Sequence, residues 1–324
     1  MKKLIACAIA GMMIFSTACA ASTSPLQQTE AKPLNIVCTI FPQYDWVRQI
    51  LGGRTDDVAL TLLLDKGTDL HSYQPTADDM VKISESDIFV YVGGESDVWV
   101  ADALREAENK NMAVINLLEV LGNEVKEEEV VEGMQLEEEE HAEGEPEYDE
   151  HVWLSLKNAQ TICKQLVETL SKADPENAAL YEKNATEYIE KLAKLDGEYQ
   201  AAVDASAHKT LLFGDRFPFR YLADDYGLDY YAAFVGCSAE TEASFATVSF
   251  LAGKLDELSL PGVLTIEGAQ HKIADTVVSN TKTKSQDVLT LNSMQSVTEK
   301  DVQNGVSYLE IMQSNLEVLK KALG

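Results

Sequence analysis

Two of the five histidines lie in stretches that suit metal binding. His71, in DLHSYQP (residues 69–75), follows a predicted buried strand and a Gly-Thr-Asp turn, and open α/β sheets bind their ligands at the carboxyl ends of strands. His151 follows an acidic run and precedes the apolar residues 152–154, which can anchor its backbone. One such histidine alone is more often a packed or exposed bystander. Two of them, on either side of a sheet crevice, favour a transition metal, because neutral imidazole suits zinc, copper, iron and nickel.

The acidic run before His151 belongs to residues 124–150, which carry fourteen carboxylates against one lysine. Few large apolar side chains interrupt this segment, so burial cannot offset the entropy of ordering it, and we expect a mobile loop. His141, within the loop, is not expected to be a fixed ligand. The charge run either attracts dications weakly or is simply solvated.

The first residues predict export. A positively charged start, an apolar stretch over residues 4–15 and small residues before Cys19 are typical of a signal peptide, here residues 1–18. Cys19 resembles the lipidated cysteine of a bacterial lipobox, although Ser16 stands where leucine is usual; cleavage without lipidation is the alternative. Residues 19–33 are expected to be a polar tether. We therefore expect an exported lipoprotein on the outer face of the cytoplasmic membrane, or a periplasmic protein.

Composition excludes several classes of protein. A net charge of −28 makes nucleic acid an unsuitable partner, and past the signal peptide no stretch has the roughly 20 apolar residues of a membrane span. Apart from Cys7 and Cys19 in the signal region, three cysteines remain without C-x-x-C spacing, so no disulfide framework is indicated. Cys38 and Cys163 are expected to be buried thiols. Cys237, in a Gly-Cys-Ser sequence after a predicted strand, is a weaker candidate for a metal-binding thiolate.

Short apolar runs alternate with amphipathic segments on both sides of residue 205. The alternation predicts an α/β fold of two lobes, residues 34–173 and 205–324, each a mainly parallel sheet flanked by helices. Residues 174–204 form one helical pattern that begins at Asp-Pro and is weakened only by Gly197, at a cost of about 1 kcal/mol. Such a helix spans about 45 Å and would brace both lobes. The predicted strands are residues 34–40, 58–64, 88–92, 112–115, 210–213, 230–234, 262–266 and 287–291.

Six stretches together resemble the metal-uptake solute-binding proteins of ABC transporters, the zinc and manganese family with a rigid interdomain helix. The resemblance covers residues 34–324. It implies that His71 and His151 bind a divalent transition metal, zinc first and manganese as the alternative, in a cleft between two lobes. It further implies a lipid-anchored monomer that delivers the metal to a membrane ABC permease, and it likens residues 137–148 to a metal-gathering loop. The stretches are F-P-x-Y (41–44), D-L-H-S-Y-Q-P (69–75), E-H-V-W-L-S (150–155), D-P-x-N (174–177), Y-G-L (226–228) and G-x-x-Y (305–308).

The second lobe departs from this family pattern at the position of the third ligand, where Arg216 stands. Arginine keeps its proton and cannot bind a cation. Asp215, beside it at the end of a predicted strand, is our first choice as a replacement, and Glu267, at the end of another, is the second. A helix cap for Asp215 and an ion pair for Glu267 are the structural alternatives. His271 is third in order.

The fourth family ligand, commonly an acid, is implied in the turn after the last strand, where this chain has the neutral Asn292 and Gln295. Arg216 can instead pair with Asp215 or Glu267, which would leave two histidines, one carboxylate and water around the metal. The predicted metal ligands are thus His71, His151, Asp215 and Glu267.

Two other functions stay open. The altered third and fourth positions also fit a family member that binds manganese, another ligand or only a partner protein. An exported zinc hydrolase would need three protein ligands, a bound water and a general base. The sequence has no H-E-x-x-H, G-x-S-x-G or Gly-rich phosphate loop, so we expect capture and delivery of a metal without catalysis.

Overall fold

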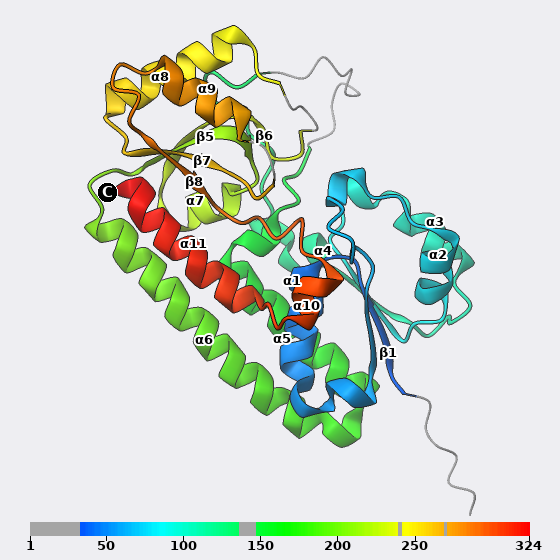
Figure 1. Cartoon of the computed structure of the whole chain (residues 1–324). Helices are drawn as coiled ribbons and strands as arrows, with labels where there is room; N and C mark the ends of the chain where they lie inside the picture. The colour runs from blue at the N-terminus through cyan, green and yellow to red at the C-terminus, as the bar shows by residue number, and fades with distance from the viewer. Residues whose placement is uncertain (1–32, 136–146, 239–241, 269–270) are drawn as a thin grey trace, which may run out of the picture. The chain divides into compact units, whose positions relative to one another are not determined.

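The computed structural model describes residues 33–135, 147–238, 242–268 and 271–324, which form two lobes around two four-stranded parallel sheets (Figure 1). The strand order is β2-β1-β3-β4 in the first sheet and β6-β5-β7-β8 in the second. Helices flank both sheets, and one long helix, α6, connects the lobes. The predicted fold class is confirmed.

The first lobe contains β1 (Asn35–Cys38), α1 (Phe41–Leu51), β2 (Ala59–Leu62), α2 (Ala77–Ser84), β3 (Ile88–Tyr91), α3 (Val100–Glu106), β4 (Ala113–Asn116), α4 (Leu117–Leu121) and α5 (Leu156–Ala173). The second contains β5 (Thr210–Phe217), α7 (Arg220–Tyr226), β6 (Asp229–Val235), α8 (Phe245–Leu258), β7 (Gly262–Thr265), α9 (Lys272–Asn280), β8 (Asp287–Thr290), α10 (Glu299–Gln303) and α11 (Tyr308–Leu323). All strand pairs are parallel, so the loops after the strands of one sheet meet at one edge.

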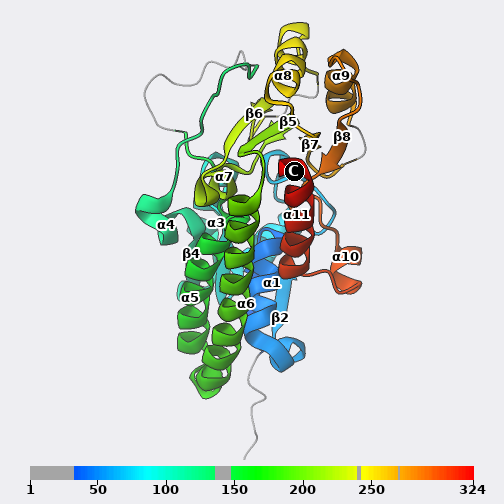
Figure 2. The same ribbon diagram turned by 90° about the vertical axis from the view of Figure 1, so that its left-hand side faces the viewer.

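The 28-residue helix α6 (Ala178–Ala205) runs alongside both lobes (Figures 1 and 2). Near its start, Asn184 Nδ2 donates a hydrogen bond of 2.9 Å to the Ile50 carbonyl of α1. Near its end, Tyr199 Oη donates a hydrogen bond of 2.6 Å to the Met312 carbonyl of α11. One helix is thus anchored to each lobe at a different point along its length. The buried residues of α6 recur at helical spacing and so form one face of the helix: Tyr181, Ala185, Tyr188, Leu192, Leu195, Tyr199 and Val203.

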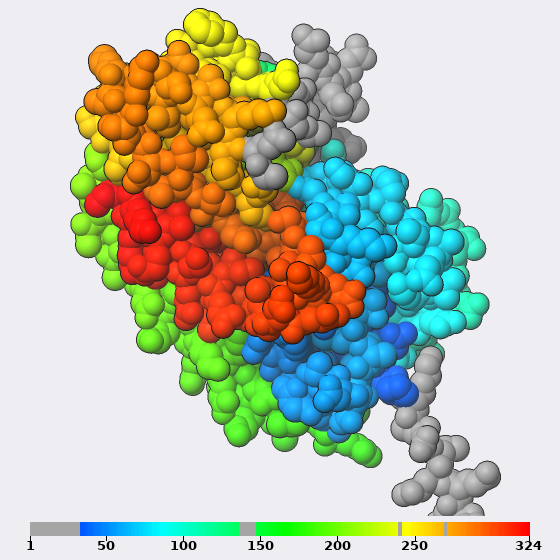
Figure 3. All heavy atoms as spheres, in the orientation of Figure 1, coloured from blue at the N-terminus to red at the C-terminus, as the bar shows by residue number. Residues whose placement is uncertain are grey.

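The chain crosses back to the first lobe after the second sheet is complete. Residues 298–308 lie against the first lobe, where orange and blue atoms meet in Figure 3. The backbone amide of Tyr308 donates a hydrogen bond of 2.8 Å to the buried Asp45 carboxylate, and Arg48 donates one of 2.8 Å to the Val306 carbonyl. One core cluster around α1, α5, α6 and α11 therefore extends through both lobes, and the second lobe has a further core between its sheet and the helices α8 and α9.

Several predictions fall outside the described residues. They concern the signal peptide, the lipid on Cys19, most of the tether and His141. Among the residues that the structure describes, no helix combines the length and apolarity needed to cross a bilayer.

The anchoring of α6 gives a stability prediction. Tyr199→Phe keeps the buried ring and removes only the hydroxyl that bonds Met312, so the free energy of unfolding should fall by about 1 to 2 kcal/mol. Urea unfolding followed by circular dichroism measures this change. Glu190→Gln, at an exposed position of the same helix, is the control and should unfold as the wild type does. An unchanged midpoint for Tyr199→Phe would show that this contact does not contribute.

Candidate metal centre

His71 lies in a 3-10 turn (Leu70–Ser72) between β2 and α2. Asp69 precedes the turn and accepts a hydrogen bond of 3.0 Å from the His71 backbone amide. His71 Nδ1 lies 2.8 Å from Ser96 Oγ and 3.6 Å from Glu150 Oε2. These oxygen atoms favour a proton on Nδ1, which leaves the lone pair on Nε2.

His151 is fully buried and stands just before a second 3-10 turn (Val152–Leu154). The Asp149 carboxylate accepts hydrogen bonds from the His151 backbone amide at 2.8 Å and from Nδ1 at 3.1 Å. Because an ionised carboxylate only accepts hydrogen bonds, Nδ1 carries the proton and Nε2 the lone pair. A carboxylate in this position orients a metal-binding histidine. Trp153 fixes the turn to the second lobe through Nε1, which donates to the Ser293 carbonyl at 2.8 Å.

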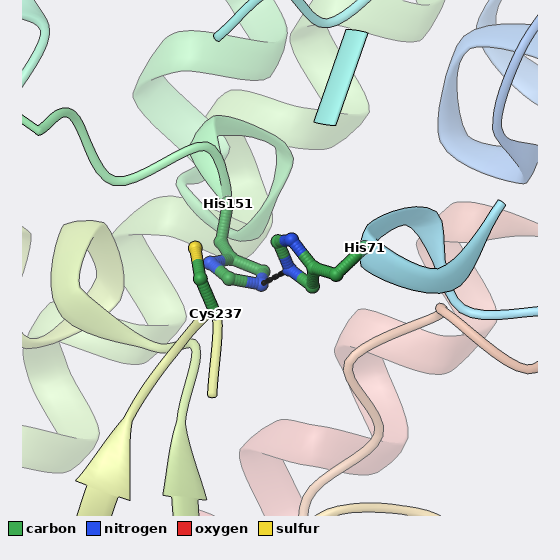
Figure 4. A group of neighbouring side chains, drawn as sticks. All are labelled: His71, His151 and Cys237. Carbon is green, nitrogen blue, oxygen red and sulfur yellow. Dashed lines mark hydrogen bonds between the residues drawn. The ribbon is translucent and has the colours of Figure 1, made fainter. Parts of the chain in front are cut away.

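The two Nε2 atoms lie 3.1 Å apart (Figure 4). A tetrahedral zinc ion with Zn–N bonds of about 2.0–2.1 Å holds two nitrogen ligands roughly 3.3 Å apart, so the spacing suits one shared ion. Burial, and then the neighbouring His151 ring, lower the pKa of His71 to about 3. His71 is therefore neutral at physiological pH, which is the form that binds metals. The 3.1 Å contact is a hydrogen bond if one Nε2 carries a proton; with protons on both Nδ1 atoms instead, both Nε2 lone pairs would be available to a cation between them.

Cys237 completes a group of three metal-binding side chains with His71 and His151. One ligand atom from each residue lies within 4.8 Å of the other two, and the described residues contain no other group of three or more histidine, cysteine or acidic side chains that meets this distance. Cys237 follows β6 and approaches from the second lobe (Figure 4). The sequence did point to Cys237 as a possible ligand, because it follows a predicted strand, but as a weaker candidate than the acids Asp215 and Glu267.

Asp215 and Arg216 lie in β5 and are not members of this group. The Asp215 carboxylate accepts hydrogen bonds from two backbone amides, that of Arg216 at 2.9 Å and that of Ile266 at 3.3 Å. Burial raises the pKa of Asp215 above its usual range. The Arg216 guanidinium pairs with the Asp69 carboxylate of the first lobe, and so differs from the expected pairing with Asp215 or Glu267. The ion pair joins the turn that carries His71 to the second lobe.

Glu267 also lies apart from the histidine pair. Its carboxylate accepts hydrogen bonds from the Ser293 amide at 2.6 Å, the Ser293 hydroxyl at 2.9 Å and the Gln295 amide at 2.9 Å. It therefore holds the loop after β8 in place. His271 precedes α9, and the side chain of Asn292 accepts a hydrogen bond from the Met294 amide. Ligation by Asp215 or Glu267 stays a prediction.

Comparison with known proteins gives the family. The family model described as "ZnuA: Zinc-uptake complex component A periplasmic" matches residues 36–322. The chain belongs to the ZnuA family. The resemblance seen in the sequence motifs is confirmed.

Curated relatives of this ZnuA-family chain carry zinc in their names. The zinc-binding lipoprotein AdcA of Streptococcus pneumoniae (strain ATCC BAA-255 / R6) is 31% identical over 325 residues, which cover 99% of this chain and 61% of that protein. The chain thus spans about three fifths of the length of AdcA. The high-affinity zinc uptake system protein ZnuA of Bacillus subtilis (strain 168) is 31% identical over 325 residues, which cover 97% of this chain and 96% of that protein.

Solved structures share the fold. The Zn(II)-bound ZnuA-like domain of Streptococcus pneumoniae AdcA superposes with a TM-score of 0.70 at 30% identity, over 90% of this chain and 99% of that domain. The metal-dependent lipoprotein YcdH of Bacillus subtilis gives a TM-score of 0.72 at 29% identity, with coverage of 90% and 99%.

The two ends of the acidic segment pair just before His151, in the sequence leading to the candidate metal centre of this ZnuA-family chain. The Glu128 amide donates a hydrogen bond of 2.8 Å to the Glu147 carbonyl, and the Asp149 amide donates one of 2.9 Å to the Lys126 carbonyl. Beyond this pairing the segment contacts the second lobe, where Gln135 bonds the backbone of β6. Residues 136–146 lie outside the described residues, so the expectation of a mobile loop is not tested there.

The charge of the acidic segment should act on the rate of metal binding. Replacement of Glu137 to Glu140 by glutamine removes four negative charges close in sequence to the site and should slow zinc association at low ionic strength, by about twofold to tenfold. Stopped-flow mixing with a fluorescent zinc indicator measures the rate. The equilibrium affinity should stay within about twofold, since no expected ligand is changed, and the rate difference should shrink as salt is added. A salt-independent difference would contradict an electrostatic origin.

Proposed function

We propose that the protein is an extracytoplasmic solute-binding protein that captures a divalent transition metal, first of all zinc, between its two lobes and delivers it to an ABC permease. The observation that carries the proposal is the 3.1 Å spacing of His71 Nε2 and His151 Nε2. Zinc is the cargo and is bound and released without chemical change. Manganese is the alternative metal.

The chemistry of the histidine pair supports zinc. Both rings are buried or nearly so, and Asp149 together with Ser96 orients their Nδ1 atoms. Neutral imidazole is a common zinc ligand, whereas manganese prefers carboxylate and water oxygens. The names of AdcA and of Bacillus subtilis ZnuA agree with this choice. Asp215 and Glu267 remain the acids proposed from the sequence, and each would have to leave backbone hydrogen bonds to reach the ion.

Capture is proposed to involve small movements. Because α6 is anchored to both lobes by Asn184 and Tyr199, a wide hinge opening would break buried contacts. The turn that carries His71 is joined to the second lobe by the ion pair between Asp69 and Arg216, and Asp69 also accepts a hydrogen bond from the His71 amide. Displacement of that turn would admit or release the metal, and the loaded form would dock on the permease.

The remaining parts of the proposal rest on the sequence. Residues 1–18 would direct export, and a lipid on Cys19 would hold a monomer on the outer face of the membrane. We propose no catalytic role. A ZnuA-family member that binds another ligand or only a partner is the second candidate, and Arg216 at the expected ligand position favours it. Metal analysis of the purified protein, with competing zinc and manganese, separates the two.

The histidine pair gives the central prediction. His71→Ala and His151→Ala should each lower zinc affinity at least tenfold, equivalent to about 1.4 kcal/mol, because each removes one coordinate bond. Competition with a chromogenic chelator measures the affinity, and circular dichroism checks the fold. His208→Ala, distant in sequence and outside the three-residue group, is the matched control. Wild-type affinity in both histidine variants would remove the proposed site.

Arg216 gives a prediction of opposite sign. Arg216→His removes a fixed positive charge near His71 and restores the residue type that the family pattern implies, so zinc affinity should be retained or rise, by up to about tenfold. The same chelator competition applies. Arg220→His removes a guanidinium that pairs with Glu129 instead, and it serves as control. A large loss of affinity in Arg216→His alone would mean that the ion pair with Asp69 is needed to place His71.

A further inference from the structure

The most informative departure from the sequence expectations is the third member of the group around the two histidines. His71 comes from the first lobe, His151 from the segment between α4 and α5, and Cys237 from the end of β6 in the second lobe. We propose that the Cys237 sulfur is the third protein ligand of the metal, so that the ion is bound by two imidazoles and one thiolate. The inference rests on the proposed metal-binding function and deepens it.

The backbone around Cys237 is fixed close to His151. A Cβ atom added at Gly236 would lie 3.0 Å from His151 Cε1, so glycine permits the close approach of this strand end to the ring. The backbone amide of Cys237 donates a hydrogen bond of 3.2 Å to the Glu128 carboxylate. The backbone just after β6 therefore lies against the His151 ring on one side and is hydrogen-bonded to Glu128 of the acidic segment on the other.

The acids predicted as ligands are engaged in hydrogen bonds elsewhere, whereas the thiol belongs to the same group of side chains as the two histidines. Asp215 and Glu267 would each break two or more hydrogen bonds to reach the ion. A tetrahedral zinc with Zn–N bonds near 2.0–2.1 Å and a Zn–S bond near 2.3 Å holds sulfur and nitrogen roughly 3.6 Å apart. The sulfur and one nitrogen of each imidazole already lie within 4.8 Å of one another, so the thiol is near both rings and would have to move closer to share an ion with them.

The proton of the thiol must leave as the metal–sulfur bond forms. Burial, and then the neighbouring Glu128, Asp149 and Glu150, raise the pKa of Cys237 above its usual range, so the free thiol is protonated. A bound dication reverses this preference, because a coordinating thiol is deprotonated outright. The S–H bond breaks, the proton passes to solvent and the sulfur donates its electron pair to the ion; no oxidant or reductant takes part. Carboxylates that disfavour a lone thiolate also attract the dication that replaces the proton.

A thiolate would change the selectivity of the site. Thiolate and imidazole together suit zinc, while manganese prefers oxygen ligands. A site with sulfur should therefore discriminate against manganese more strongly than a site completed by Asp215 or Glu267.

Cobalt(II) reports the presence of sulfur directly, because a cobalt–thiolate bond absorbs in the near ultraviolet. The full chain without its signal peptide is titrated with cobalt(II), and zinc affinity is measured in parallel by chelator competition. We expect a charge-transfer band in the wild type and in Cys163→Ala, which removes a buried thiol outside the group. Cys237→Ser and Cys237→Ala should lose the band and lower zinc affinity at least tenfold. Thermal unfolding of the metal-free proteins shows whether each variant is folded.

The outcomes separate the inference from the proposed function. If the wild type binds cobalt without the band and Cys237→Ser binds zinc as the wild type does, Cys237 is not a ligand, while a loss of binding in His71→Ala still supports the metal site. If Asp215→Asn or Glu267→Gln lowers zinc affinity and Cys237→Ser does not, the third ligand is that acid and the inference is overturned. If no transition metal binds the wild type, both the inference and the proposed function fail.

Discussion

The helix α6 is the constraint on which the candidate metal centre depends, because it fixes the distance between two lobes that each supply part of the centre. Asn184 bonds α1 of the first lobe and Tyr199 bonds α11 of the second, and the helix is continuous between them. Metal ligands must be placed to within a few tenths of an ångström, so the lobes that carry them require a rigid connection. The return of residues 298–308 onto the first lobe adds a second connection, through the bond between Tyr308 and Asp45.

The ion pair between Arg216 and Asp69 affects which side chains can face a bound dication. Arg216 stands where the family pattern implies a ligand, and a free guanidinium there would repel a metal. Its ion pair with Asp69 neutralises the charge and ties the turn that carries His71 to the second lobe. Arg216 thus adds a contact between the lobes at the position where the family pattern implies a ligand. Cys237 and the acids Asp215 and Glu267 remain as the side chains that could complete the coordination.

The sequence predicts the parts of this molecule that local patterns control. Strands alternating with helices, the long helical period of α6 and the two histidine motifs are all local, and the fold they predict is the one observed. The neighbours of each side chain are not local. Asp215 stands at the expected strand position, yet its carboxylate bonds the Ile266 amide of the loop after β7, a contact that only the pairing of β5 with β7 creates. The proximity of Cys237 to His151 likewise depends on how β6 ends against another segment.

The buried carboxyl group of Glu150 lies beside the His71 ring, so its ionisation state affects the charge around the candidate metal centre. Burial raises the pKa of Glu150 to about 7, so near neutral pH this carboxyl is partly protonated. One oxygen of Glu150 accepts a hydrogen bond from the Ser96 amide at 2.9 Å, and the other lies 3.6 Å from His71 Nδ1. A dication bound at the opposite nitrogen of that ring makes the N–H a stronger donor and favours the ionised carboxylate. The carboxylate in turn makes the imidazole a better ligand. Ser96 and Glu150 thus lie on the Nδ1 side of the His71 ring, while its Nε2 atom faces His151.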